Sequence, residues 1–388
     1  MQRFNFPVVE PDPALEELRE ELQAFLKEEL NAGNFRPEPE GWMASADPEF
    51  SKKMGKNGWI GLTWPSRYGG HDKTALERYI VTEEMLRAGA PVGAHWIADR
   101  QHAPMLLAHG TEEQKLDILP RIAAGECYFA IGLSEPGAGS DLANVKTRAE
   151  KIDAKNGGGW KINGQKIWSS GAHICHYMVA LLRTSPADGR NRHVGLSQIM
   201  IDLSLPGVTI KSITDLSGDA HFNEVHFEDV IVPDDALLGE EGGGWKQVTS
   251  ELAMERSGPE RFLSSYITLE TALHQLQGRL GTDSLARLGK LIANLRTLKG
   301  MSWGIANLLH RGVSPETEAA LVKDLGNRLE NDLTQQVRAM LVDLPEAEWS
   351  EEMRRIINVG VLRSPPNTLR GGTTEILRGI VARQLGLR

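Results

Sequence analysis

The chain is poor in cysteine, in basic clusters and in long apolar runs, and each shortage excludes a class of protein. Its two cysteines, Cys127 and Cys175, have no metal-type spacing and cannot build a disulfide framework. No apolar run approaches the roughly 18 residues that a membrane span needs. The first residues, MQRFNFPVVEPDP, lack the basic region and apolar core of a secretory signal. We therefore expect a cytoplasmic globular protein without an integral membrane segment.

The chain also lacks an excess of positive charge. The net charge is −9 over 388 residues and no run of Lys and Arg stands out, which argues against a nucleic-acid partner. The length allows two or three structural units around a sizeable apolar core. With 40% apolar and 24% charged residues, the composition is ordinary for such a protein.

Hydrophobic periodicity predicts helices, then strands, then helices. Helical spacing begins at Leu15, after Asp12 and Pro13, and strand-like runs fill the middle third from about Cys127 to Gly239. Helical spacing returns at Trp245. Because strands and helices do not alternate, the order argues against a Rossmann fold. We expect an α+β protein with an N-terminal helical domain, a middle antiparallel β domain and a C-terminal helical bundle, covering 1–126, 127–240 and 241–388.

Two local patterns give more specific predictions. Asn163-Gly164 stands between two short apolar runs, which predicts a hairpin turn because this pair accepts positive φ. In the C-terminal third, five residues at helical spacing predict one apolar helix face: Leu285, Leu288, Ile292, Leu295 and Leu298.

The stretch LSEPGAGSDL at 133–142 bears most directly on function. A Walker phosphate loop needs a lysine where Ser140 stands. A nucleophile elbow needs glycine on both sides of its serine, which neither Ser134 nor Ser140 has. A dinucleotide turn needs a strand–turn–helix unit that is missing here. Two interpretations stay open: an ordinary turn, or a loop in which Gly137 and Gly139 let backbone N–H groups approach an anion or a flat heterocycle such as a flavin.

Four segments, in order along the chain, resemble the acyl-CoA dehydrogenase family. They are GLSEPGAGSDL (132–142), INGQKIWSSG (162–171), VHFEDVIVPDDALLGEEGGGW (225–245) and GGTTEILRGIVARQLGL (371–387). The resemblance implies an acyl-CoA dehydrogenase-like fold and a FAD-dependent oxidoreductase of acyl-CoA catabolism or β-oxidation. Such an enzyme converts an acyl-CoA thioester into a trans-2-enoyl-CoA and passes the electrons to an electron-transfer flavoprotein. It implies no metal.

The resemblance also implies roles for individual residues. Ser134 matches the residue that bonds the pyrimidine side of the flavin, and Ser140 matches a contact to the pyrophosphate and to CoA. Trp168 matches the aromatic side chain beside the flavin ring, and Ser170 matches the hydroxyl that faces N5. The residues implied to bind FAD are Ile131, Leu133, Ser134, Gly139, Ser140, Trp168, Ser169, Ser170, Thr373 and Glu375. Those implied to contact the substrate are Ser140 and Arg256.

The catalytic base departs from the pattern of many family members. They carry a glutamate directly before Gly-Thr in the C-terminal motif, where this chain has Gly371 in LRGGTTEI. Gly371 has no carboxylate, but its backbone N–H is implied to polarise the thioester carbonyl. Isovaleryl- and long-chain-type enzymes place the glutamate before an arginine on a C-terminal-domain helix, which matches Glu255-Arg256 in ELAMERSGPERF. We expect Glu255 to abstract the α-proton, with Glu260 as its nearest rival.

Two family features are missing from this chain. There is no RxxFG segment of the kind that reaches the neighbouring subunit's FAD, and INVGVLRSPPNTLRGG replaces the usual adenine loop. These departures resemble a bacterial branch that includes steroid side-chain and dicarboxylyl-CoA dehydrogenases, some of them heteromers. A homodimer, a homotetramer and a heteromer therefore stay open. So do two other functions: a flavin oxidase or monooxygenase on the same fold, and a flavin-poor, non-catalytic subunit of a heteromeric dehydrogenase.

Overall fold

A computed structural model describes residues 4–10, 12–189, 191–254 and 258–387. The chain forms two compact units, each assembled from segments that lie far apart in the sequence. Unit 1 comprises 1–45, 73–92 and 253–388, and unit 2 comprises 46–72 and 93–252. The division at 126/127 and 240/241 stays a prediction.

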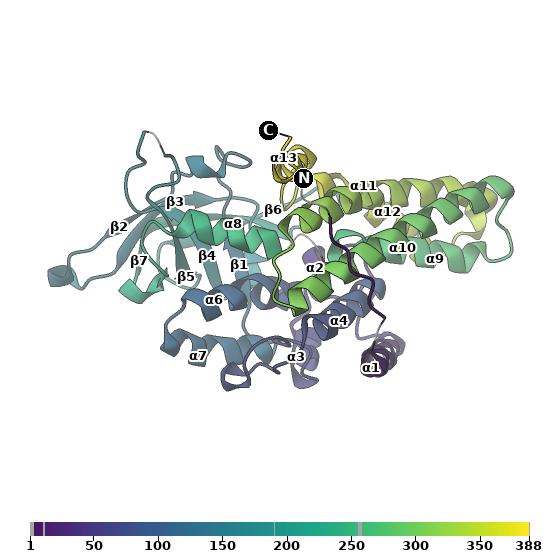
Figure 1. The fold of residues 1–388 in the computed structure, drawn as a ribbon, viewed down its shortest axis with the longest axis horizontal. Helices are drawn as coiled ribbons and strands as arrows, with labels where there is room; N and C mark the ends of the chain where they lie inside the picture. Colours follow the sequence, from purple (N-terminus) through teal and green to yellow (C-terminus); the bar gives the residue numbers. More distant parts are fainter. Residues whose placement is uncertain (1–3, 11, 190, 255–257, 388) are drawn as a thin grey trace. The chain divides into compact units, whose positions relative to one another are not determined.

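Unit 1 is helical (Figure 1), and the helices α1, α4, α12 and α13 begin at side-chain caps. Asp12 caps the first helix by accepting the N–H of Ala14, with Pro13 in the first turn. Thr74 and Glu77 form a capping box at the start of α4. The helices are α1 (Pro13–Asn31), α2 (Gly41–Ala44), α4 (Ala75–Arg87), α9 (Tyr266–Leu276), α10 (Thr282–His310), α11 (Glu316–Met340), α12 (Glu351–Arg363) and α13 (Thr374–Gln384).

The apolar face predicted for the C-terminal third is only partly correct. Leu298 is buried, but Leu285 and Ile292 are 54% and 44% exposed. The buried seam of α10 runs instead through Ser284, Leu291, Leu298 and Ile305. These residues are seven apart, the spacing that keeps side chains on one narrow seam between two long helices. The sequence pattern misses this because apolar side chains also lie beside the seam.

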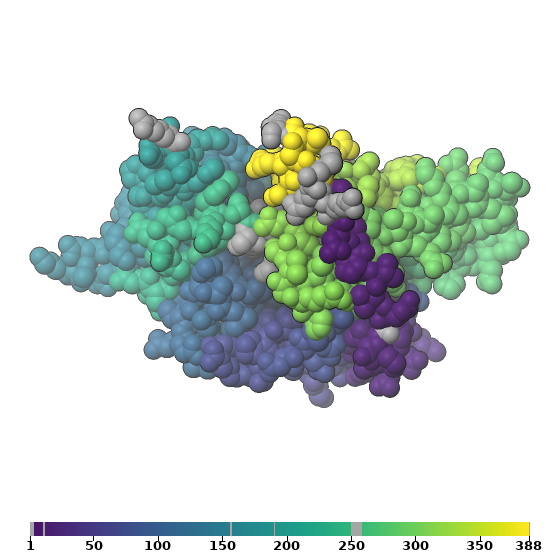
Figure 2. All heavy atoms as spheres, viewed as in Figure 1, coloured from purple at the N-terminus to yellow at the C-terminus, as the bar shows by residue number. Residues whose placement is uncertain are grey.

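The N-terminal segment is held along α10 and α11 inside unit 1, where Figure 2 shows its purple atoms against the green ones. The Trp303 indole N–H donates to the carbonyl of Val9 at 2.8 Å, and the N–H of Asn5 donates to Glu318 at 2.9 Å. A Cβ at Gly304 would lie 3.1 Å from the Pro7 carbonyl oxygen, so this glycine permits the close approach.

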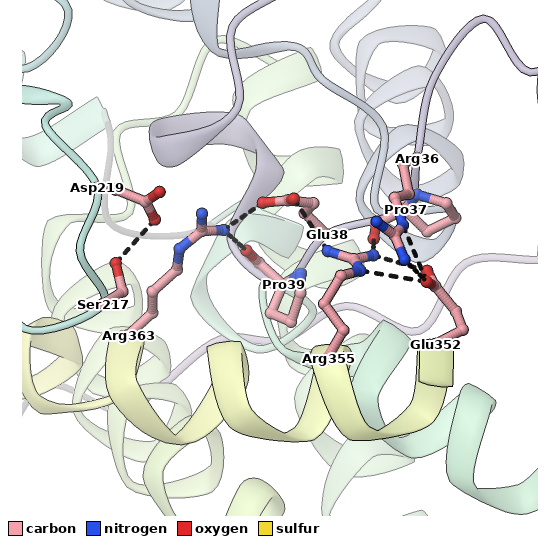
Figure 3. A network of polar contacts seen from close by, with 9 residues as sticks. All are labelled: Arg36, Pro37, Glu38, Pro39, Ser217, Asp219, Glu352, Arg355 and Arg363. Atoms are coloured by element: carbon pink, nitrogen blue, oxygen red, sulfur yellow. Dashed lines mark hydrogen bonds and ion pairs between the residues drawn. The ribbon is translucent and has the colours of Figure 1, made fainter. Parts of the chain in front are cut away.

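A polar network fastens residues 37–39 to α12 (Figure 3). Arg355 donates to the carboxylate of Glu38 at 3.0 Å and to the carbonyl of Pro37 at 2.6 Å. Arg363, further along the same helix, donates to the other oxygen of Glu38 at 2.8 Å and to the carbonyl of Pro39 at 2.9 Å. Arginine suits this position because its planar fork serves a carboxylate and a carbonyl together. The segment that leads into α2 is thereby tied to the C-terminal helices of unit 1.

Unit 2 carries the β-sheet and a smaller set of helices. The strand order is β6-β7-β3-β2-β4-β5-β8, with β1 paired to β4. Most neighbours are antiparallel as expected, but β1–β4 and β2–β4 are parallel. The strands are β1 (Phe129–Gly132), β2 (Arg148–Lys151), β3 (Trp160–Lys166), β4 (Tyr177–Arg183), β5 (Leu196–Asp202), β6 (Val208–Ile213), β7 (Phe222–Val232) and β8 (Leu237–Leu238). The helices are α3 (Pro48–Lys56), α5 (Gly93–Ile97), α6 (Ala103–His109), α7 (Glu112–Ala123) and α8 (Gly244–Met254, within unit 2 up to 252), with a π-helical turn at Ala98–His102.

The two faces of the sheet bury different partners. One face forms a large apolar core among the strands themselves, including Trp160, Met178 and Ile199. On the other face, Leu181 and Leu196 pack with Val248 of α8 and with residues 133–145. The sheet therefore supports the loop 133–142.

The predicted hairpin turn at Asn163-Gly164 is wrong, because both residues lie inside β3. They sit opposite a β-bulge, where residues 228–229 of β7 face a single residue of β3. Asn163 fits this place because its side chain accepts the N–H of Asp229 and donates to the Asp229 carboxylate, both at 2.9 Å. The turn between β2 and β3 is made by Gly157–Gly159, all three at positive φ.

Candidate functional site

The loop 133–142 leaves β1 and makes a tight turn. The N–H of Glu135 donates to the Ala138 carbonyl at 2.9 Å, and the N–H of Ala138 donates back to the Glu135 carbonyl at 3.0 Å. Gly137 and Gly139 have no left-handed backbone, and a Cβ on either would meet no described atom within 4 Å. Neither backbone strain nor packing among the described residues requires glycine there. A flat group lying against this backbone would require it.

A buried ion pair holds the loop on the sheet. Lys166, the last residue of β3, donates from Nζ to Glu135 at 2.8 Å and to the carbonyls of Leu181 and Leu133 at 2.6 and 3.2 Å. The Glu135 carboxylate also accepts the backbone N–H groups of residues 146–147. Burial lowers the pKa of Lys166 to about 8, against the opposing effect of Glu135. Burial alone would raise the pKa of Glu135. The ion pair with Lys166 and the hydrogen bonds from residues 146–147 outweigh burial and lower this pKa below its ordinary value.

Trp168 follows β3 in a strained conformation. Its φ of 62° lies in the left-handed region, which costs a bulky residue about 1–3 kcal/mol. The side chain is 54% exposed, and its ring meets Phe222 edge-on at 5.7 Å between centroids. The preceding residue, Ile167, donates its N–H to the Ser134 carbonyl at 2.9 Å, which fixes Trp168 beside the loop. An exposed aromatic ring held at a cost next to an open glycine loop suits a flat heterocycle.

The serines after Trp168 are held by β7. Ser169 and Asn223 exchange backbone hydrogen bonds at 3.0 and 3.1 Å, and the Asn223 side chain donates to the Ser169 carbonyl. The Ser169 Oγ is buried and has no partner among the described residues, so a polar group bound here would satisfy it. Ser170 is partly exposed.

The remaining residues predicted in unit 2 lie around the same loop. Ile131 in β1, Leu133 and Ser134 are partly buried, whereas Gly139 and Ser140 are exposed. The adjacent Asp141 is paired with Arg192, whose guanidinium approaches both carboxylate oxygens at 3.0 and 3.1 Å. His193 stacks on Trp245 with 3.9 Å between ring centroids. The β4–β5 connection is thus attached to the end of the loop.

Three further predicted residues, Gly371, Thr373 and Glu375, lie in unit 1 around the start of α13. Gly371 and Gly372 have φ of 64° and 107°, so both need the freedom of glycine. Thr373 caps α13 by accepting the N–H of Ile376. Glu375 is exposed in the first turn, where its own backbone N–H and the Thr373 hydroxyl lower the pKa of its carboxyl.

Gly371 lies among cationic side chains. Lys323 of α11 is fully buried and donates from Nζ to the Arg370 carbonyl at 2.6 Å. A Cβ on Gly371 would lie 3.0 Å from Cε of Lys323 and 3.8 Å from Nη1 of Arg261. The guanidinium of Arg370 pairs with the carboxylate of Glu40. Both arginines lie over the Trp42 ring, at 4.9 Å for Arg370 and 5.5 Å for Arg261.

Glu255 and Arg256 lie outside the described residues, so their roles stay predictions. The segment that follows them is anchored by Glu330 of α11, which accepts the N–H groups of Ser264 and Ser265 at 2.7 and 2.9 Å. Burial raises the pKa of Glu330 to about 7. The Ser264 hydroxyl in turn donates to the carbonyl of Glu260 and accepts the indole N–H of Trp42, at 2.7 and 2.8 Å. The backbone at Ser264 and Ser265 is therefore held against α11.

Other ionisable groups of unit 2 have structural surroundings. The buried His95 is hydrogen-bonded to Ser51 at 2.8 Å, and burial, with Arg100 nearby, lowers its pKa to about 3. Burial raises the pKa of the free Cys127 thiol to about 11.

A cavity of about 350 Å³ is lined by residues such as Arg121 and His176, and by none of the residues predicted to bind FAD. Among the described residues, no cluster of three or more His, Cys, Asp or Glu side chains could hold a metal ion, and no helix is long and apolar enough to cross a membrane.

Comparison with known proteins decides the family. Residues 12–126 match the acyl-CoA dehydrogenase N-terminal domain, and residues 130–230 match the acyl-CoA dehydrogenase middle domain. The acyl-CoA dehydrogenase IpdE1 of Mycobacterium tuberculosis (strain ATCC 25618 / H37Rv) is 31% identical over 393 residues, which cover 96% of this chain and 98% of that one. The chain belongs to the acyl-CoA dehydrogenase family. It is accordingly an oxidoreductase of that family.

Solved structures share this fold over nearly the whole chain. The Tcur3481-Tcur3483 steroid ACAD has a TM-score of 0.83 and 28% identity, covering 97% of this chain and 98% of that one. The ChsE4-ChsE5 complex from Mycobacterium tuberculosis has a TM-score of 0.81 and 29% identity, covering 98% and 99%. The predicted α+β architecture of helices, sheet and helices is confirmed.

Sequence reasoning missed several residues around the acyl-CoA dehydrogenase motifs. Glu135 and Lys166 stand inside two of the quoted motifs, yet nothing in a single sequence shows that they pair. Asn223 had no sequence signal of its own. Lys323 had a weak one, because it stands among the apolar residues of AALVKDL on an otherwise polar helix.

Proposed function

We propose that this acyl-CoA dehydrogenase family member binds FAD on the loop 133–142 and beside Trp168. The observation that carries the proposal is Trp168, an exposed aromatic ring in strained backbone next to open glycines. The Ser169 hydroxyl, which has no partner in the described part of the chain, supports it, because FAD has many polar atoms to offer such a group. The residues present thus fit the cofactor, with Ser134, Ser140 and Ser170 as further hydroxyl donors.

The proposed reaction oxidises an acyl-CoA thioester to a trans-2-enoyl-CoA. FAD, when bound, supplies the hydride acceptor for the β-carbon. Glu255 takes the α-proton, for which it needs only a carboxylate within hydrogen-bond reach of that carbon. The Gly371 N–H hydrogen-bonds the thioester carbonyl, where negative charge develops as the α-proton leaves. Arg256 and Ser140 contact the substrate, while Thr373 and Glu375 contact the cofactor.

The proposal also names a substrate class, partners and a domain division. Because a similar solved structure is titled a steroid ACAD, thioesters of steroid side chains are the first acyl groups to test. Two of the solved structures are named for pairs of chains, so assembly with a second, related chain is part of the proposal. An electron-transfer flavoprotein accepts the electrons, in the cytoplasm. The three predicted domains, 1–126, 127–240 and 241–388, divide the protein.

Anaerobic reduction of the flavin by a panel of acyl-CoA thioesters tests this function. We expect the yellow absorption of the FAD-loaded protein to bleach with at least one saturated thioester and to leave an enoyl-CoA product. The matching 2-enoyl-CoA, which has no hydride to give, is the control. Bleaching that requires a free amine or nitroalkane instead, or hydrogen peroxide formed at the catalytic rate in air, contradicts the dehydrogenase assignment.

A further inference from the structure

The carbonyl group of the peptide bond between Arg370 and Gly371 accepts a hydrogen bond from a buried lysine. Lys323 donates from Nζ to that carbonyl at 2.6 Å, a short charge-assisted hydrogen bond. The lysine is fully buried on α11, and it also contacts the Asn327 side chain at 3.5 Å. A buried ammonium group costs free energy unless it is hydrogen-bonded, so breaking the contact with the Arg370 carbonyl would be unfavourable.

The same peptide unit carries the N–H of Gly371. A trans peptide is planar, and its N–H points away from its C=O. A cation on the oxygen therefore fixes the direction of the N–H and draws electron density toward the oxygen, which makes the N–H a stronger donor. The described part of the chain offers no acceptor to the Gly371 N–H. We propose that Lys323 positions and polarises the Gly371 N–H for the acyl thioester carbonyl, a role that rests on the proposed function.

Lys323 also accounts for the glycine. A side chain at 371 would begin 3.0 Å from Cε and 3.5 Å from Nζ of Lys323, in a backbone with φ of 64° that disfavours any Cβ. A carboxylate built there would lie beside Lys323 and Arg261, where cations favour its charged form and weaken it as a base. The cationic surroundings of Gly371 thus suit a hydrogen-bond donor to a developing negative charge better than they suit a proton acceptor.

Kinetics of the FAD-loaded enzyme test the catalytic part of this inference. Lys323→Met keeps the length of the side chain and removes the charge, so we expect flavin reduction by the best thioester to slow by about 10- to 100-fold, less than the roughly 10²–10³-fold loss of a whole oxyanion donor. The KM is expected to change by less than about threefold, because the contact strengthens mainly as charge develops. Lys323→Arg, which keeps the charge, is expected to restore part of the rate. Lys290→Met, an exposed lysine of α10, is the matched control.

A spectroscopic measurement tests the same inference without turnover. The dipeptide Arg-Gly occurs three times, at 311–312, 370–371 and 378–379. Labelling arginine carbonyls with ¹³C and glycine nitrogens with ¹⁵N therefore yields three correlated amide signals in the FAD-loaded protein. We expect Lys323→Met to move the Gly371 signal and to leave the Gly312 and Gly379 signals in place. Gly371→Ala identifies its signal by removing it. If the Met variant does not fold, Lys323→Gln, a neutral donor, replaces it in both experiments.

The outcomes separate this inference from the proposed function. An unmoved Gly371 signal in the Met variant overturns the positioning role, whatever the enzyme does. A moved signal with an unchanged rate of flavin reduction overturns its catalytic importance. If no thioester reduces the wild-type flavin, the proposed function fails, and the signal still decides whether Lys323 sets the Gly371 peptide.

Discussion

In the proposed mechanism, Gly371 and Glu255 share the work that the family resemblance assigns to a single glutamate in many members. A base must lie within reach of the α-carbon, but the chemistry does not depend on which helix carries it. Once the carboxylate is elsewhere, position 371 is free to be a glycine at positive φ, and the space beside it is filled by the buried Lys323. Under the proposed mechanism, Glu255 only removes the proton and Gly371 only donates the hydrogen bond.

Glu255→Gln tests the base at the residue scale. The variant is expected to keep its FAD and to bind the best thioester, because the amide is nearly the same size. Flavin reduction should slow by about 10²–10⁴-fold, since the amide cannot accept the α-proton. Stopped-flow absorbance under anaerobic conditions measures this rate.

Two other glutamates make the Glu255 result specific. Glu241, exposed before α8, should tolerate the change to Gln without loss of rate. Glu260, buried with Arg261 at 3.8 Å, is the rival base. If Glu260→Gln abolishes reduction while Glu255→Gln reduces normally, the assignment passes to Glu260.

At the element scale, the loop 133–142 and strand β3 act as one piece because Lys166 and Glu135 join them under the surface. Lys166 also donates to the carbonyl of Leu133, the residue before Ser134. In the sequence, Lys166 lies two residues before Trp168. Removing one partner of such a buried pair leaves an uncompensated charge and typically costs about 3–5 kcal/mol. The distance between the loop 133–142, which is proposed to bind the flavin, and Trp168 therefore depends on this ion pair.

The lowered pKa of Lys166 gives this pair a signature in the pH dependence of stability. Its pKa is about 8 in the folded protein and about 10.4 in an unfolded chain. Between these values the unfolded chain binds more protons, so this lysine makes the free energy of unfolding increase with pH over that window. The contribution of Lys166 to the free energy of unfolding is fully present above the pKa of the unfolded chain, and it is lost as the pH falls through about 8.

Denaturant unfolding between pH 8 and 10 is the measurement, with the double variant Lys166→Met/Glu135→Gln as the reference. The double variant lacks both titrating groups, so its free energy of unfolding should rise less, or fall more, with pH than that of the wild type. Identical slopes in the two proteins would show that Lys166 titrates normally, and the buried charge would then need another explanation.

At the scale of the whole molecule, each unit is assembled from distant segments, and the proposed site residues fall in both. Unit 2 holds the glycine loop, Trp168 and the serines, while unit 1 holds Gly371, Thr373 and Glu375. Folding of either unit needs chain from both halves of the sequence. A fragment containing only 127–240 would therefore lack residues 46–72, 93–126 and 241–252 of unit 2.

The flavin content of the chain purified alone is the prediction at this scale. We expect close to one FAD per chain and a rise in the thermal midpoint with added FAD, because a ligand at 100 times its Kd stabilises the native state by about 2.7 kcal/mol. Absorbance and a thermal melt measure both. A chain that stays colourless with excess FAD would contradict a complete site and would require a second chain to supply it.

The sequence by itself determined the order of helices and strands, the start of the first helix after Asp12, and the family. These properties are local or linear. The hydrophobic period, the capping residues and the order of the motifs can be read without knowing which residues are in contact in the folded protein. The same is true of the small residues in 133–142, whose types already suggested an open loop.

Only the tertiary structure decided which partners those residues have. Asn163-Gly164 has the chemistry of a turn, but a bulge in β7 and the run Gly157–Gly159 placed the turn elsewhere. The buried seam of α10 depends on the helix it faces, which no period reveals. Glu135 lies 31 residues from Lys166, and Lys323 lies 47 residues from Arg370. Burial turns these pairs into strong, directed contacts, and burial exists only once the chain has folded.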